Sequence, residues 1–420
     1  MSVRSERIFS GGRPCCRGEL LMKLAGIIAE YDPFHNGHAW QLAQAKALGA
    51  EHVAVAMSCG LTQRGAVPLL PEEVRVRAAL TCGADLVFAL PAPSACSGAE
   101  AFARAGVRIL SAAGCDALVF GAETPDSSLL MEAAHLLLSE EYHAALKKQL
   151  AGGARNFAAA RQAAVESLCP DSGLSDLLNK PNNNLAIEYC KAILEQNAAM
   201  TPVPLPRQGA NHGEALAQSA AGQFASASAL RKLWVGQGVD ALRPYVPESV
   251  FPLYQEAFFS GRYTDFSAAG RYEMALLRAA CQSDTPFINI RGISEGLEHR
   301  LENAVRSYTA QEELLDALTT VRYPRARMRR LAMDAALDYA PELNVLPPYL
   351  HLLGGRRELF SLLKGTALPV SHSLSRLREE NSSCAAFVQA QLAASDFAAF
   401  CRQKPEPMGG VLRQKIIFLT

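Results

Sequence analysis

The feature that most constrains the fold is a regular alternation of short apolar runs and helical patterns between residues 22 and 125. Four runs, "KLAGIIAEY", "HVAVAMS", "DLVFALP" and "ALVFGAE", have the length and composition of buried strands. Between them, Pro71 is typical of a first helical turn, and Gly49, Gly83 and Gly114 are typical of helix ends. This rhythm predicts an α/β fold with a Rossmann-like, doubly wound parallel sheet, whose ligands bind at the carboxyl ends of the strands.

The strand rhythm ends near residue 240, and later segments such as "GRYEMALLRAACQ" and "QEELLDALTTV" have helical periodicity. We therefore expect a sheet domain over residues 22–240 and a C-terminal, mainly helical domain over residues 241–420. Residues 1–21 are Arg-rich and lack the apolar core of a secretory signal, so they predict a disordered extension.

Composition excludes several classes of protein. Hydrophobic residues make up 49% of the 420 residues, which is enough for real cores, yet the apolar runs are too short to cross a bilayer. The 41 basic and 41 acidic residues cancel, so net charge does not indicate a polyanionic partner. The 11 cysteines lack the spacing of a zinc site or a disulfide framework. We expect a cytoplasmic protein without a metal site of its own, and no protein partner is evident.

Two histidines stand where such a sheet places its chemistry. In "EYDPFHNGHAWQLAQA", His35 and His38 flank Asn36 and Gly37 between the first predicted strand and the first predicted helix. A glycine lets a phosphate approach the backbone, a helix start offers N–H groups, and imidazoles can donate to phosphate oxygens as charge builds. The alternative is an ordinary Asn-Gly turn with a histidine on the helix surface. The position favours phosphate binding, and His35 and His38 are the catalytic candidates.

Other polar positions predict contacts to the same ligand. Gly121 ends the fourth predicted strand, where a missing side chain would let an adenosine lie against the backbone; a structural glycine in the turn is the alternative. Asn182 is at the head of an apolar helix, where N-capping is the ordinary role. Ser226, Ser228 and Arg231 begin another predicted helix, where hydroxyls and a cation suit phosphate; the alternative is a capped surface helix.

An arginine cluster is the strongest charge feature of the second half of the chain. The segment "VRYPRARMRRLAMDAAL" places five arginines within nine residues, beside Tyr323. Such a run is usually a solvated helix face, but arginines next to an aromatic ring also suit phosphate contact and base stacking in RNA. The candidate RNA-binding residues are Arg322, Arg325, Arg327, Arg329 and Arg330.

These motifs, in this order, resemble a known family. "HNGH" is similar to the HxGH signature of the nucleotidyltransferase superfamily. The longer series "GIIAEYDPFHNGH", "MSCGLTQRG", "KPNNNLAIEY" and "ISEGLEHRLENAV" resembles the bacterial tRNA(Met) cytidine acetate ligases, from Met22 to at least residue 340. The resemblance implies that the chain activates acetate with ATP as acetyl-adenylate and then acetylates the wobble cytidine of elongator tRNA(Met). Magnesium with ATP is a general expectation for triphosphate chemistry.

The resemblance also implies which residues bind ATP: the segment that enters the first helix, the positions weighed above, and an arginine after the proline-spaced run "TPVPLPR", which predicts a fifth strand. The expected set is Ile28, Ala29, Glu30, Tyr31, Asp32, Pro33, Phe34, His35, Asn36, Gly37, His38, Ala39, Trp40, Gln41, Gly121, Asn182, Arg207, Ser226, Ser228 and Arg231.

The chain departs from the family pattern at four positions, one of which is Ala122 in "FGAE", where the family has serine. Gly60, Ala66 and Glu72 stand where the family commonly has asparagine, glutamate and lysine. Two other functions stay open at the level of sequence. One is a small-molecule adenylyltransferase whose helical half serves oligomerisation, and the other is a noncatalytic RNA-binding relative.

Overall fold

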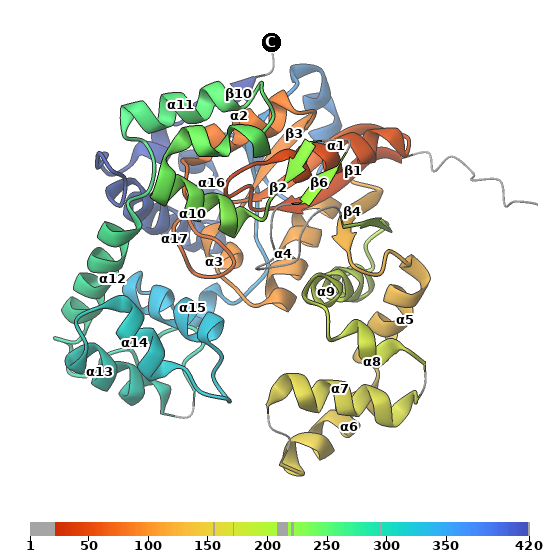
Figure 1. The fold of residues 1–420 in the computed structure, drawn as a ribbon, viewed down its shortest axis with the longest axis vertical. Coiled ribbons are helices and arrows are strands. Elements are labelled where there is room, and N and C mark those ends of the chain that lie inside the picture. The colour runs from red at the N-terminus through yellow and green to blue at the C-terminus, as the bar shows by residue number, and fades with distance from the viewer. Residues whose placement is uncertain are drawn as a thin grey trace, which may run out of the picture.

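The computed structural model describes residues 22–153, 156–170, 172–207, 217–219, 222–294 and 296–418. Its centre is an eight-stranded sheet in the order β10-β8-β3-β2-β1-β4-β5, with β9 paired to β8 (Figure 1). The strands of this sheet are β1 Met22–Ala29, β2 Ala50–Ser58, β3 Leu86–Leu90, β4 Ala117–Ala122, β5 Thr201–Pro206, β8 Leu350–Gly355, β9 Val370–Ser371 and β10 Ile417–Phe418. A separate hairpin pairs β6 Ala217–Ser219 with β7 Gly222–Phe224. The expected N-terminal extension lies outside the described residues.

The five strands predicted from the sequence form the parallel part of the sheet. β1 pairs in parallel with β2 on one side and β4 on the other, and β3 and β5 extend the sheet outward. This order confirms the predicted Rossmann-like fold, because the direction of winding reverses between β1 and β4. Pro202 and Pro204 suit β5, since it is an edge strand and proline cannot donate to a ladder. A ligand is expected where β1 and β4 end.

Helices cover both faces of the sheet. One face packs against α1 Asn36–Ala47, α2 Glu72–Thr81, α10 Ala227–Gln237 and α11 Phe251–Ser260. The other face packs against α4 Ala99–Ala112, α5 Ser127–Leu138 and α9 Pro181–Glu195. Between α5 and α9 the chain forms a small helical extension of α6 Glu140–Ala151, α7 Phe157–Leu168 and α8 Leu174–Leu177, at the lower right of Figure 1.

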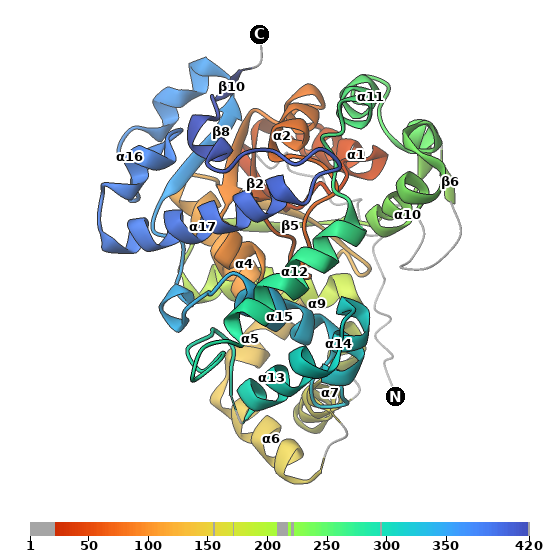
Figure 2. The same cartoon turned by 90° about the vertical axis from the view of Figure 1, so that its left-hand side faces the viewer.

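A block of four helices follows, and it has its own apolar core. It consists of α12 Phe266–Ala280, α13 Leu297–Ser307, α14 Gln311–Leu318 and α15 Arg325–Ala336. Figure 2 shows these helices grouped below the sheet, with α16 Leu374–Arg378 and α17 Ser382–Phe400 on the left. The remaining short elements are α3 Ala92–Ala95 and 3-10 turns over Val239–Tyr245, Pro341–Leu343, Arg357–Leu363 and Gly410–Arg413. No helix in the described part of the chain is long and apolar enough to cross a membrane.

The end of the chain returns to the sheet. β8 lies antiparallel to β3, and β10 lies parallel to β8. The second half of the chain is mainly helical, as expected, but a boundary at residue 240 does not separate the sheet from the helices. The sequence signal was weak here because β8 is one short run, "LHLLGG", isolated among helical patterns.

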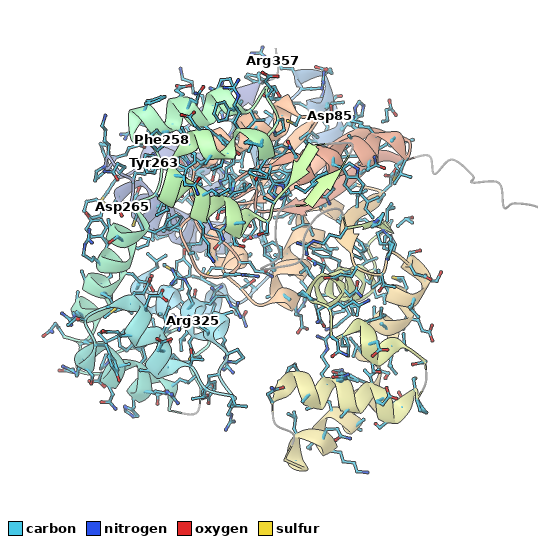
Figure 3. The ribbon with its side chains drawn as sticks, in the orientation of Figure 1. Asp85, Phe258, Tyr263, Asp265, Arg325 and Arg357 are labelled. Carbon is cyan, nitrogen blue, oxygen red and sulfur yellow. The ribbon has the colours of Figure 1, made fainter. Side chains whose placement is uncertain are left out.

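One buried carboxylate ties this late strand to the early ones. Asp85 precedes β3 and is 3% exposed (labelled in Figure 3). It accepts hydrogen bonds from the backbone N–H of Val53 at 2.8 Å, from Lys46 Nζ at 2.5 Å and from Arg356 Nε at 2.8 Å. These partners belong to β2, to the last turn of α1 and to the segment after β8. One side chain therefore fixes three elements that are distant in sequence.

We predict that Asp85→Ala lowers the free energy of unfolding by about 3 kcal/mol, because it leaves a buried N–H and two cations without their common acceptor. Urea denaturation measures this change. Lys46→Ala removes only one half-exposed partner, so it should cost less than about 1 kcal/mol. Equal losses in the two variants would contradict a central role for the carboxylate.

Candidate active site

A cavity of about 340 Å³ opens where β1 and β4 end, at the position expected from the winding of the sheet. Most of the ATP-binding residues expected from the sequence line it. These are Ile28, Ala29, Glu30, Tyr31, Asp32, His35, Gly37, His38, Trp40, Gln41, Gly121, Asn182, Arg207 and Ser226. The other six expected residues, Pro33, Phe34, Asn36, Ala39, Ser228 and Arg231, do not line it. The fold therefore gathers residues of β1, α1, β4 and α9, and residues next to β5 and α10, around one space.

The two histidines are held by the start of α1. His35 is its N-cap, and its Nδ1 accepts the backbone N–H of Gly37 at 3.1 Å. Nδ1 of His38 accepts the backbone N–H of His35 at 3.2 Å, so the two side chains form a reciprocal capping box. The rings stack with their centroids 3.7 Å apart. Because both Nδ1 atoms accept, each neutral ring carries its proton on Nε2 and keeps that N–H for another partner.

Both imidazoles are uncharged in this environment. Burial lowers the pKa of His35 to about 4, and the nearby cation of Arg207 adds to the effect. Burial and the adjacent His35 ring lower the pKa of His38 well below its ordinary value. The site therefore offers two neutral N–H donors side by side near pH 7, together with the fixed cation of Arg207.

The segment between β1 and α1 is fixed at several points. The buried guanidinium of Arg75 donates to the carbonyl oxygens of Glu30 and Ser58, each at 2.8 Å. The hydroxyl of Tyr254 donates to the carbonyl of Phe34 at 2.7 Å. These contacts hold the backbone on both sides of Asp32 in place, so the histidines are positioned by the protein rather than by a ligand.

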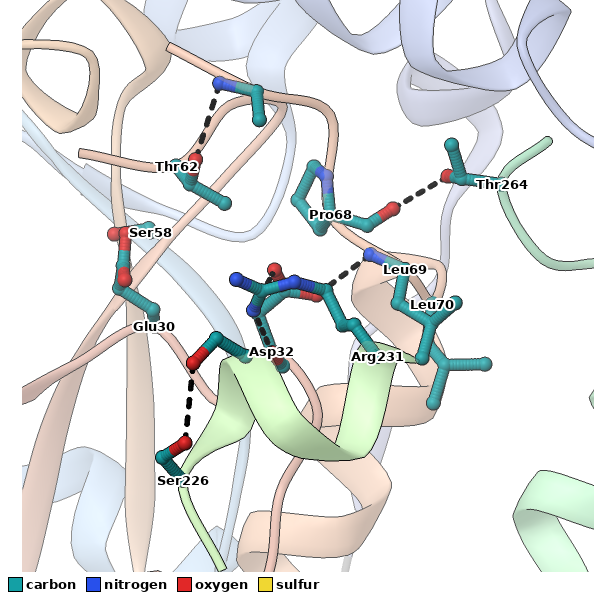
Figure 4. Close-up of polar contacts among 12 residues, drawn as sticks. Glu30, Asp32, Ser58, Thr62, Pro68, Leu69, Leu70, Ser226, Arg231 and Thr264 are labelled. Atoms are coloured by element: carbon teal, nitrogen blue, oxygen red, sulfur yellow. Dashed lines mark hydrogen bonds and ion pairs between the residues drawn. The ribbon is translucent and has the colours of Figure 1, made fainter. Parts of the chain in front are cut away.

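Arg231 was expected to contact phosphate in the cavity, but its side chain pairs with Asp32. It donates to the carbonyl oxygen of Asp32 at 2.5 Å and to its carboxylate at 3.0 Å, and that carboxylate also accepts the N–H of Leu69 at 2.6 Å (Figure 4). Ser226 lines the cavity and caps α10 through the N–H of Ala229, and its hydroxyl lies 3.1 Å from that of Ser228. Of the three donors expected from this helix start, only Ser226 faces the cavity.

The start of α9, which lines the cavity through Asn182, is capped by Glu123 from the loop after β4. Glu123 accepts the backbone N–H groups of Asn182 and Asn183, at 3.1 and 2.7 Å, and the side-chain amide of Asn182 at 2.6 Å. Burial raises the pKa of Glu123, but these hydrogen bonds outweigh it and lower the pKa overall. Glu123 therefore caps α9, and the asparagines do not take the N-cap role that was the alternative to ATP contact. A Cβ added at Gly121 would meet no atom within 4 Å, so the cavity is open there.

Sequence reasoning missed several residues of the cavity wall. Phe102, Phe120, Tyr189 and Phe224 contribute aromatic surface, and they come from four different elements. No local pattern marks them, because only the packing of distant segments brings them together. Gln63 had a signal, since it lies in the "QRG" segment that matches the family; its N–H donates to the carboxylate of Glu30 at 2.6 Å.

The four departures from the family pattern are not among the residues that line this cavity, and three of them lie beside other cavities. Gly60 has a φ of +73°, and an added Cβ would lie 2.8 Å from Cβ of Ala394 in α17, so a side chain does not fit there. Glu72 lies with Gly60 beside a separate cavity next to α17, where burial raises its pKa. Ala66 lines a third cleft near α10.

The arginine cluster does not form one surface. Arg325 lies 2.5 Å from Glu312 and also pairs with Asp316, while Arg329 lies 4.0 Å from Glu312 (Arg325 is labelled in Figure 3). Two others lie on a different side of α15, where Arg327 and Arg330 line a cleft with Ser97 and Gly98 from the loop between α3 and α4. The guanidinium groups of Arg322 and Arg327 lie over the ring of Tyr323, at 5.7 and 5.0 Å from its centroid.

Arg330 connects the cluster to the cavity. It donates to the carbonyl oxygen of Gln63 at 3.4 Å. Gly65 makes the contact close, because a Cβ there would lie 3.0 Å from the backbone of Arg330. Within the described ranges, no group of three or more His, Cys, Asp or Glu side chains is arranged to hold a metal ion.

Comparison with known proteins defines the class. Residues 22–409 match the family model described as HIGH Nucleotidyl Transferase, so the chain is a nucleotidyltransferase of this class. It is 33% identical over 364 residues to the tRNA(Met) cytidine acetate ligase of Caldanaerobacter subterraneus subsp. tengcongensis, covering 83% of this chain and 88% of that protein. It is 34% identical over 352 residues to that of Caldicellulosiruptor saccharolyticus, covering 81% and 85%. The chain belongs to the family of tRNA(Met) cytidine acetate ligases.

Solved structures agree with this assignment. The chain superposes on Thermotoga maritima TmcAL bound with alpha-thio ATP with a TM-score of 0.84 and 25% identity, over 95% of this chain and 100% of that one. The apo form of the same protein gives a TM-score of 0.86.

The lowered pKa of His35 predicts a pH dependence of stability. Between its ordinary value of about 6.5 and about 4, the unfolded chain binds a proton at this residue and the folded chain does not. The free energy of unfolding should therefore fall as the pH falls through this interval, by up to about 3 kcal/mol from His35, and should gain nothing from it above pH 6.5.

Urea denaturation at a series of pH values, comparing the native chain with His35→Asn, isolates this contribution. Asparagine still accepts a hydrogen bond as an N-cap but does not titrate. The variant should lose less stability between pH 6.5 and pH 4. Identical slopes in the two proteins would mean that His35 is not held neutral.

Proposed function

We propose that this chain is an ATP-dependent ligase that activates acetate as acetyl-adenylate and then acetylates the wobble cytidine of elongator tRNA(Met). The observation that carries the proposal is the pair of neutral Nε2–H donors at the winding reversal of a nucleotidyltransferase sheet. Support also comes from the names of the relatives and from the ATP analogue bound to Thermotoga maritima TmcAL.

The first step requires little covalent chemistry from the protein. A carboxylate oxygen of acetate attacks the α-phosphorus, the bond from that phosphorus to the β-phosphate bridging oxygen breaks, and pyrophosphate leaves. Charge grows on the phosphoryl oxygens, so the protein must position the reactants and donate hydrogen bonds. His35 and His38 supply two donors, and Arg207 supplies a cation. Gly121 and Asn182 also line the cavity, and we propose that the adenosine lies against them.

The second step transfers the acetyl group. The N4 atom of cytidine attacks the acetyl carbon, the bond to the adenylate oxygen breaks, AMP leaves, and N4 gives up a proton. We propose that magnesium enters with the triphosphate, since Mg²⁺ is commonly held by substrate phosphates. We also place the reaction in the cytoplasm, where tRNA is found.

We propose that the tRNA approaches along α15. Arg327 and Arg330 line a cleft next to the loop between α3 and α4, and Arg330 contacts the Gln63 segment of the nucleotide cavity. Arg325 is less suited to phosphate, because Glu312 and Asp316 already compensate its charge.

We expect His35→Asn to lower acetate-dependent release of pyrophosphate from ATP, without tRNA, by roughly a hundredfold or more, as loss of one transition-state donor does. Asparagine keeps an N-cap acceptor but does not reach as far as the imidazole Nε2–H. His52→Asn, at a histidine on β2 outside the cavity, serves as the matched control and should retain normal release. A native rate in the first variant would remove His35 from the mechanism.

We expect the double change Arg327→Ala and Arg330→Ala to raise the KM for tRNA at least tenfold, because two phosphate contacts are lost. Arg325→Ala is the matched control on the same helix, and its effect should be clearly smaller. Filter binding of labelled tRNA(Met) at several salt concentrations gives an independent measurement. A larger effect of Arg325→Ala would reverse the assignment of faces on α15.

A further inference from the structure

A second large cleft adjoins the nucleotide cavity. It lies between α10, α12, the start of α14 and α15, and residues 66–67 complete its wall. We call it the α10–α12–α15 cleft. Its volume is about 860 Å³, compared with about 340 Å³ for the nucleotide cavity. Figure 1 shows α12, α14 and α15 below α10. It is large enough for a group of nucleotide size.

The cleft and the nucleotide cavity share a thin wall. On α10, Ser226 faces the cavity, whereas Ser228, Arg231 and Lys232 face the cleft. The ion pair between Arg231 and Asp32 crosses this wall, since Asp32 lines the cavity and Arg231 lines the cleft (Figure 4). Only this ion pair would therefore separate a ligand in the cleft from the nucleotide cavity at this point.

The cleft wall combines apolar surface with cations. Val235 is 67% exposed and Phe266 is half-buried, while Met333 and Phe397 line the cleft with side chains that are almost completely buried. Three cations line the cleft, namely Lys232, Arg271 and Arg329, of which Arg329 lies 4.0 Å from the exposed acid Glu312 in the same wall, so Lys232 and Arg271 are the cations left for a phosphate. Aromatic and apolar surface next to cations is the combination that holds an unstacked base and its phosphate.

A buried acid in the same wall lacks a partner for one oxygen. Glu273 of α12 is 1% exposed, and one carboxylate oxygen accepts a hydrogen bond from the side-chain amide of Gln311. The other oxygen, Oε1, has no hydrogen-bond partner. Burial raises the pKa of Glu273 to about 7. Buried polar atoms are normally satisfied, so a lone acceptor in the wall of a cleft indicates a ligand that carries a donor, such as the edge of a nucleobase.

We infer that the α10–α12–α15 cleft binds one unpaired nucleotide of the RNA substrate. Its base lies on the apolar wall near Phe266 and donates toward Glu273, and its phosphate lies at Lys232 and Arg271. This inference rests on the proposed function, and it adds a binding site to the arginine face of α15. RNA is favoured over an acidic peptide because the cleft offers both a cationic rim and an orphan acceptor at its floor.

The first test is the double change Lys232→Ala and Arg271→Ala in the full chain, with Lys148→Ala on the surface of α6 as the control. The KM for tRNA(Met) should rise roughly tenfold. Acetate-dependent pyrophosphate release without tRNA, and its KM for ATP, should stay at native values. The slope of log affinity for tRNA against log salt should become shallower by roughly 0.7 for each lost phosphate contact, which general damage to the fold would not produce.

The second test fills the cleft without changing charge. Ala310 is exposed at the start of α14 and lines the cleft, so Ala310→Trp places a ring inside it. This variant should acetylate tRNA(Met) at least tenfold less efficiently and keep the native salt slope. Glu273→Gln should weaken tRNA binding less, because it keeps a carbonyl acceptor.

The outcomes separate the two hypotheses. A native chain that releases no pyrophosphate with acetate, or that never acetylates tRNA, refutes the proposed function. If the native chain performs both steps and the variants keep its KM for tRNA and its salt slope, only the cleft assignment is overturned. If the variants raise the KM for ATP and leave the KM for tRNA unchanged, the cleft binds the triphosphate, and the cleft assignment is overturned as well. If an acidic peptide competes for tRNA binding to the native chain as well as RNA does, the cleft is a nonspecific anion surface and the inference is wrong.

Discussion

The site depends on one buried cation. Arg75 is 1% exposed, and its guanidinium joins the carbonyl oxygen of Glu30, just after β1, to that of Ser58 at the end of β2. A charge withdrawn from water in this way is tolerated only where acceptors surround it, and these acceptors are the ends of two central strands. The segment that carries the histidines begins at Glu30. The same contact that closes the core therefore fixes where the imidazoles lie.

The histidine pair shows how packing selects a chemical state. Two rings stacked 3.7 Å apart and withdrawn from water cannot both carry charge, so the fold keeps them neutral and orients them through backbone donors. Permanent charge is supplied by Arg207, while Arg231 is compensated by Asp32. The cavity thus takes its neutral hydrogen-bond donors from the two histidines and its permanent charge from Arg207.

The sequence predicted the features that depend on neighbouring residues in the chain. It missed the features that depend on contacts with residues distant in the sequence. The strand pattern, the helix starts and the HNGH segment are local, and the structure places them as expected. The predicted phosphate contact of Arg231 requires its side chain to point into the cavity. Its side chain instead pairs with the carboxylate of Asp32, which is 199 residues away in the sequence. Likewise, the five arginines separated into faces because Glu312 and Asp316, on the preceding helix, pair with only part of the cluster. β8 was missed because its strand character comes from pairing with β3 rather than from a repeated pattern.

The late return of the chain to the sheet has a consequence for synthesis on the ribosome. β3 receives its second neighbour only when β8, Leu350–Gly355, has been made, so an incomplete chain displays an unpaired strand edge beside a nearly finished nucleotide cavity. Exposed edges attract other strands. Long-range pairing of this kind also slows folding. Until β8 has been made, the open edge of β3 is therefore the part of the sheet most exposed to pairing with other strands, and chaperones that shield strand edges would act there.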